Sequence, residues 1–119
     1  MHFSPLLLTL TAFAFTSIFT FLPKDAQSET LIPRSMPGDK GKYYLLESMR
    51  TGNIVRSLHK RVGIDTVDFT RTETNCKNRQ MRVLGSGEGE QDIKESPTPW
   101  FDLVPGSSKS DLANFVCKW

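Results

Sequence analysis

Residues 67–84 read VDFTRTETNCKNRQMRVL, and this stretch decides the fold. Threonine stands at every second position from 70 to 74, and β-branched residues at that spacing are typical of a pleated, partly exposed strand, here over 67–76. Lysine and asparagine at 77–78 predict a turn, and the following residues predict a return strand over 80–84. The stretch therefore predicts an antiparallel β-hairpin.

Further strands are expected on both sides of this hairpin. Upstream, Gly52 supplies the positive φ that a tight hairpin turn needs, so the turn at 50–53 joins two strands. Downstream, the glycine-rich segment 85–89 predicts a flexible loop, and prolines bound the short elements after it. The additional strands are expected over 43–49, 54–62, 92–96 and 100–104.

The C-terminal segment has the clearest helical pattern in the chain. Ser108 is the expected N-cap, and Asp111 stands three residues later as a weaker capping-box partner. Apolar side chains from Leu112 to Cys117 form one broad face, and the opposite face is expected to carry Asp111, Asn114 and Lys118. This pattern places Cys117 on the packed side of the helix, within reach of a sheet residue such as Cys76.

The N-terminus predicts export. Residues 3–22 are uncharged and largely apolar, and small residues at the −3 and −1 places precede Glu29, so 1–28 are interpreted as a signal peptide cleaved after Ser28. An uncleaved membrane anchor is the alternative, since about 20 apolar residues span a bilayer. The mature chain then begins with an extended or disordered arm over 29–41, followed by a single domain over 42–119.

Exactly two cysteines, Cys76 and Cys117, lie in the mature part, 41 positions apart. In an exported protein such a pair predicts one disulfide, and two free thiols in a reducing compartment are the alternative. The predicted fold class is therefore α+β: a small antiparallel sheet of about five to six strands, with one C-terminal helix packed on it and tied to it by one disulfide.

Charge and composition point away from several function classes. The net charge is +2, from 15 basic and 13 acidic residues, and Lys24 and Asp25 of the leader cancel. Such a field predicts no nucleic-acid binding. The mature chain has one histidine, His59, and neither a nucleophile motif nor a zinc motif, so no enzyme, no cofactor and no metal are expected. The acidic residues from Glu88 to Glu95 are interpreted as a solvated loop.

The candidate binding residues are Arg56, Lys60 and Arg61, which lie in a basic stretch without acidic residues. A second basic stretch follows, ending at Arg82, and an exposed Trp100 ring is a further candidate contact. Together these features predict a surface for an acidic partner, such as a sulfated glycan or an acidic protein segment. The alternative is ordinary charge on sheet edges, which discourages aggregation.

An ordered set of short motifs resembles the surface-adhesin protein E-like family, whose members are small exported proteins of Gram-negative bacteria. The motifs are Tyr43-Tyr44 with Ser48, Asn75-Cys76, the segment from Arg79 to Leu84, the segment from Trp100 to Ser107, and the segment from Leu112 to Cys117. The resemblance covers roughly 43–117. The chain departs from the family at Leu45-Leu46-Glu47, where an aspartate is common, and in a shortened connection before Trp100.

The resemblance implies an antiparallel sheet that carries a C-terminal helix and is tied by Cys76–Cys117. It also implies a non-enzymatic adhesin at the cell surface or outer membrane that binds host extracellular-matrix or plasma proteins and is able to form a homodimer. The alternative is a periplasmic accessory or structural protein with another ligand. Neither interpretation includes a stable membrane span once the leader is cleaved.

Overall fold

The computed structural model describes residues 29–119. The predicted signal peptide, its cleavage site and the alternative anchor lie in 1–28, outside the described residues. No helix among the residues described is long and apolar enough to cross a membrane.

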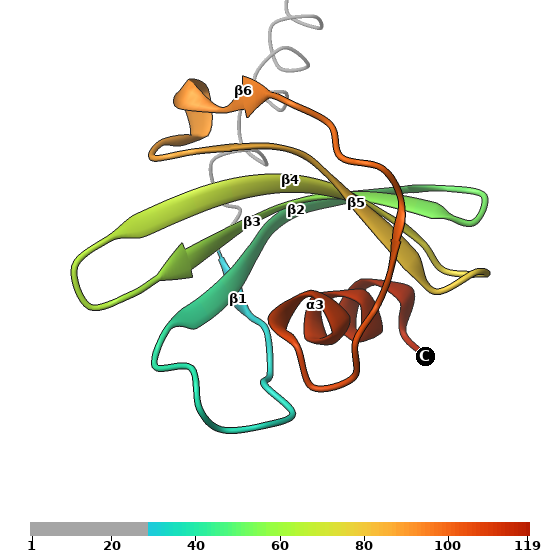
Figure 1. The fold of residues 1–119 in the computed structure, drawn as a ribbon, viewed down its shortest axis with the longest axis horizontal. Helices are drawn as coiled ribbons and strands as arrows, with labels where there is room; N and C mark the ends of the chain where they lie inside the picture. Colours follow the sequence, from blue (N-terminus) through green and yellow to red (C-terminus); the bar gives the residue numbers. More distant parts are fainter. Residues whose placement is uncertain (1–28) are drawn as a thin grey trace, which may run out of the picture.

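The described chain forms an antiparallel sheet with one α-helix packed on one of its faces (Figure 1). The strands follow the order β1-β2-β3-β4-β5-β6, and β7 pairs with β5 beside this path. This arrangement confirms the predicted α+β class with its C-terminal helix and single disulfide. The strands are β1 (Thr30–Leu31), β2 (Lys42–Thr51), β3 (Ile54–Val62), β4 (Val67–Asn75), β5 (Gln80–Gly87), β6 (Lys94–Glu95) and β7 (Phe101–Asp102); the helices are a 3-10 turn, η1 (Glu90–Asp92), and α3 (Ser108–Cys117).

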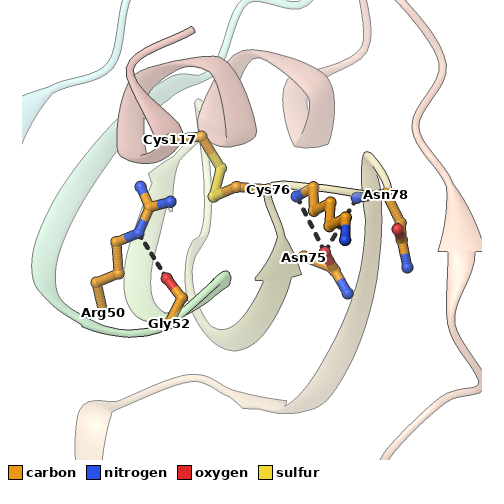
Figure 2. Close-up of a disulfide and its surroundings, with 7 residues drawn as sticks. Arg50, Gly52, Asn75, Cys76, Asn78 and Cys117 are labelled. Atoms are coloured by element: carbon orange, nitrogen blue, oxygen red, sulfur yellow. Dashed lines mark hydrogen bonds between the residues drawn. A yellow bond between two sulfur atoms is a disulfide. The ribbon is translucent and has the colours of Figure 1, made fainter.

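The hairpin turns follow from local chemistry. Gly52 has a φ of 64° between β2 and β3, which confirms the predicted role of this glycine. Between β4 and β5, the Asn75 side-chain oxygen accepts hydrogen bonds from the backbone N–H groups of Lys77 and Asn78, each at 3.0 Å (Figure 2). These local contacts shape the turn that joins β4 to β5.

Helix α3 begins one residue earlier than the sequence indicates. The N-cap is Ser107, whose Oγ accepts a hydrogen bond from the Ser110 N–H at 3.1 Å, so the prediction of Ser108 as the cap is wrong. The helix ends at Cys117, and its C-cap Lys118 adopts a left-handed conformation with φ 56° and ψ 47°. Cys117 forms the predicted disulfide with Cys76, with the two Cα atoms 5.7 Å apart (Figure 2).

The core lies between the sheet and α3 and has two parts. One contains Ile32, Met81, Leu112 and Ala113, and the other contains Val55 and the two half-cystines. Because Ile32 is almost fully buried and β1 pairs with β2, the segment expected to be an extended or disordered arm is extended and contributes to the core. The arm is therefore part of the domain rather than an appendage to it.

The glycine-rich segment differs from its prediction as a flexible loop. Residues 85–87 continue β5, and the adjacent chain comes so close that a Cβ on Gly85 would collide with the Lys94 carbonyl. A Cβ on Gly87 would likewise collide with the carbonyl of Asp92. These two glycines allow the close approach of backbone that lets β6 and η1 fold back on β5.

Two further expectations about exposure are wrong. Thr72 and Thr74 pair with Ser57 and Val55 and are completely buried, although their strand was expected to be partly exposed. Asp111 was expected on the polar face of the helix, but it is buried and accepts hydrogen bonds from Arg34 and Ser35 of the N-terminal segment. In both cases a segment distant in sequence covers a polar side chain that the local pattern assigned to solvent.

Candidate binding surface

The sheet has one face covered by α3 and an opposite face that we call the open face. Val55 of β3 packs in the core near Cys117. Because side chains alternate along a strand, the even-numbered residues of β3 point away from the helix. The strand register extends this assignment to the neighbouring strands, because residues directly opposite each other share a face. The open face accordingly carries Glu47, Met49, Arg56, Lys60, Arg71, Glu73 and Arg82. Leu58 points to the same side but is 1 % exposed, so it is not available to a partner.

Glu73 organises the middle of the open face. Arg82 donates to its Oε1 from Nε at 2.9 Å and from Nη2 at 2.7 Å, and Arg56 donates to its Oε2 at 3.1 Å. Burial raises the pKa of the Glu73 carboxyl, but the hydrogen bonds from the two guanidinium groups outweigh it, so the pKa is lowered overall. One carboxylate thus positions two arginines, and this cluster keeps a positive charge.

An aromatic ring adds to this cluster. The Arg82 guanidinium carbon lies 5.1 Å from the centroid of the Trp100 ring, which is partly exposed. The Arg56 side chain is 59 % exposed, so its guanidinium is available to a partner while it stays bonded to Glu73. A planar cation beside an indole ring is a common arrangement in protein recognition sites.

Lys60 also belongs to the open face, at the opposite end of β3 from Arg56. Its ammonium group forms an ion pair with Glu29 and lies 5.4 Å from the centroid of the Tyr44 ring. Glu29 of the N-terminal segment therefore partly neutralises the charge on Lys60. Arg56 and Lys60 lie on the same face, but Arg56 pairs with Glu73 and Lys60 pairs with Glu29.

Arg61 lies on the other face of the sheet. Its guanidinium donates to Asp39 Oδ1 at 2.7 Å and to the Tyr43 hydroxyl at 3.1 Å. The hydrogen bonds from Arg61 and Tyr43 hold the pKa of Asp39 well below its usual range. Because adjacent residues of a strand point to opposite faces, the structure does not bring the three candidate residues Arg56, Lys60 and Arg61 into one patch.

The residues that do join Arg56 come from neighbouring strands. Arg71 lies opposite Leu58 in the register, and Arg82 lies opposite Glu73. Both arginines belong to the second basic stretch of the sequence, but their shared face with Arg56 depends on strand pairing. The only sequence signal that these three arginines share a face was the alternation of side chains within each strand.

His59 lies on the covered face and is 8 % exposed. Burial, and then the charge of Lys109, lower its pKa to about 4, so the imidazole is neutral at physiological pH. Its Nδ1 is buried without a hydrogen-bond partner within the described part of the protein. The same part contains no group of three or more histidine, cysteine, aspartate or glutamate side chains placed to hold a metal ion.

Comparisons with protein-family models, curated proteins and solved structures find no match. The functional argument therefore depends on the open face and its side chains.

Proposed function

We propose that this chain is an exported, non-enzymatic binding protein that holds an acidic protein partner on its open face. The carrying observation is the Glu73 cluster, in which one carboxylate fixes the guanidinium groups of Arg56 and Arg82 beside Trp100. Guanidinium groups held in position lose little side-chain freedom when they bind a carboxylate, because their geometry is set beforehand. The resemblance to surface adhesins supports host matrix or plasma proteins as the partner class.

Export is supported by the disulfide. A bond between Cys76 and Cys117 persists in oxidising compartments and is rare in a reducing cytosol. The same bond anchors α3 on the covered face, which leaves the opposite face for a partner. Display at the cell surface is part of this proposal.

The binding test compares two variants in a panel of immobilised matrix and plasma proteins. Arg56→Ser with Arg71→Ser removes two guanidinium groups from the open face. Lys40→Ser with Lys77→Ser removes two charges from exposed positions outside the strands, as a matched control. A charge-assisted hydrogen bond contributes about 1.5 to 3 kcal/mol, so the arginine variant should bind at least about tenfold more weakly. Unchanged binding by the folded arginine variant, or an equal loss in the control, would overturn the proposal.

Protease treatment of intact cells tests the location, with a periplasmic protein as the marker. Cleavage of this protein while the marker survives is the expected result. Protection equal to that of the marker would refute surface display and direct attention to periplasmic partners.

A further inference from the structure

One edge of the sheet is unpaired over most of its length among residues 29–119. Strand β1 pairs only with Tyr44 and Leu45 of β2, through Leu31 and Thr30. Beyond this point β2 continues for six residues that we call the free edge, 46–51, and no strand of the described chain pairs with their outer side. A strand edge with unpaired N–H and C=O groups is a template for another extended chain.

A β-bulge determines which groups the free edge presents. The Ile32 N–H donates to the Tyr43 carbonyl at 2.8 Å, so before the bulge Tyr43 and Leu45 direct their polar groups outward. The register shifts between Leu45 and Glu47, which inserts one extra residue. After the shift, Ser48 and Arg50 present their N–H and C=O groups outward.

The surroundings of the free edge are hollow and positively charged. A hollow of about 880 Å³ lies beside it, lined in part by Leu46, Met49, Arg56 and Arg71. The charged side chains that line it are Arg56, Arg71 and Glu47, so their net charge is +1, and Arg71 forms an ion pair with Glu47 at 3.9 Å. Met49 is 70 % exposed and adds an apolar contact.

We propose that the free edge binds an extended acidic segment of a partner protein by β-strand addition. Main-chain hydrogen bonds with Ser48 and Arg50 supply the pairing, and alternate acidic side chains of the added strand meet Arg56 and Arg71 in the hollow. The excess of arginine selects an acidic strand and disfavours a basic one. This inference rests on the proposed function, and it names the partner's chemistry and the mode of binding.

The test uses synthetic seven-residue peptides with alternating glutamate and valine, added to the protein as purified from cells. A first peptide is unmodified, a second carries N-methyl groups on its glutamates, and a third carries them on its valines. In a β-strand, alternate residues direct their N–H groups to opposite sides. One methylated peptide should therefore bind at least tenfold more weakly than the unmodified peptide, and the other should bind equally well.

Equal binding of all three peptides would refute strand addition, while binding through charge alone would leave the proposed function standing. No binding of any peptide would also refute this inference, and the matrix-protein panel with Arg56→Ser and Arg71→Ser would then decide the proposed function separately. A matched peptide of alternating lysine and valine should not bind. Binding of the lysine peptide would contradict the selection for acidic strands.

Hydrogen exchange identifies the edge directly. The amides of Ser48 and Arg50 should exchange rapidly in the free protein and become at least tenfold slower with the unmodified peptide. Protection that is already present at every protein concentration would show that the chain's own N-terminal segment occupies the edge. Protection that grows with protein concentration would show a second copy there. Either result would overturn the proposal.

Discussion

Asp111 connects the N-terminal segment to helix α3, and its removal should unfold the protein at a much lower urea concentration. Asp111 is 4 % exposed, and its carboxylate accepts hydrogen bonds from Arg34 Nε at 2.7 Å, from Ser35 Oγ at 2.7 Å and from the Ser35 N–H at 3.0 Å. In Asp111→Ala all three donors lose this acceptor. All three belong to Arg34 and Ser35, which lie more than 70 positions away, so the contact fixes a long-range packing.

The magnitude follows from the burial of the pair. Removal of one member of a buried ion pair costs about 3 to 5 kcal/mol. The Arg34 side chain keeps 21 % exposure and also donates to the Gly106 carbonyl at 3.3 Å, which softens the loss. We therefore expect Asp111→Ala to lower the free energy of unfolding by about 2 to 3 kcal/mol. For an m-value of about 1 to 1.5 kcal/mol/M, the urea midpoint falls by about 2 M.

The same carboxyl gives this prediction a pH signature. Burial raises the pKa of Asp111, but hydrogen bonds from Ser35 and Arg34 outweigh burial and lower the pKa overall. Its contribution is therefore present above the unfolded value of about 3.9 and is lost as pH falls through the lower folded value. The difference between the wild-type protein and Asp111→Ala should shrink as pH falls below about 4.

Urea unfolding at pH 7 and at pH 2 to 3 measures both effects, with Asn114→Ala as a control on the exposed side of the same helix. A double-mutant cycle with Arg34→Ala isolates the pairwise part. A destabilisation below about 0.5 kcal/mol at pH 7, the size of an ordinary surface substitution, would refute the reasoning. A difference that stays constant across this pH range would refute its electrostatic part.

Three further predictions concern the covered face. Mass spectrometry of the unreduced protein should find a peptide pair joined through Cys76 and Cys117, whereas two alkylatable thiols would contradict the bond. Reduction should lower the free energy of unfolding by about 4 kcal/mol, because the unfolded chain is no longer closed into a loop between cysteines 41 positions apart. Thr74→Val should leave urea stability unchanged or raised, because the Thr74 hydroxyl is buried without a partner among the described residues; a loss above about 1 kcal/mol would mean that the hydroxyl is hydrogen-bonded. NMR titration should place the His59 midpoint near 4, and a midpoint near 6.5 would contradict burial as the cause. Because the folded pKa is lowered, the contribution of His59 to the free energy of unfolding should be complete above about pH 6.5 and decline as pH falls toward 4.

Local signals predicted most of the elements correctly. The turn at Gly52, the turn after Asn75 and the alternation of β4 each depend on residues close in sequence, and the structure confirms all three. The apolar face of α3 and its cysteine likewise indicated packing on the sheet. The glycines of β5 misled the prediction, because glycine marks both a flexible loop and a close approach of two backbones.

The grouping of the candidate residues required the register. Alternation along β3 separates Arg61 from Arg56 and Lys60, a consequence that follows from the strand itself. Which arginines of other strands join Arg56 depends on pairings such as Arg56 with Glu73 and Glu73 with Arg82. A shift of one residue in either pairing would move the partner side chain to the other face.

The sequence by itself determined the class of fold, the two main hairpins, the C-terminal helix and the cysteine pair, because those depend on local periodicity and turn chemistry. Only the tertiary structure decided the burial of Asp111 and Thr74, the Glu73 cluster and the length of the free edge. Each of these depends on which distant segment covers a side chain or pairs with a strand. That choice is made by the packing energy of the whole domain, to which the residues of any one segment contribute only a part.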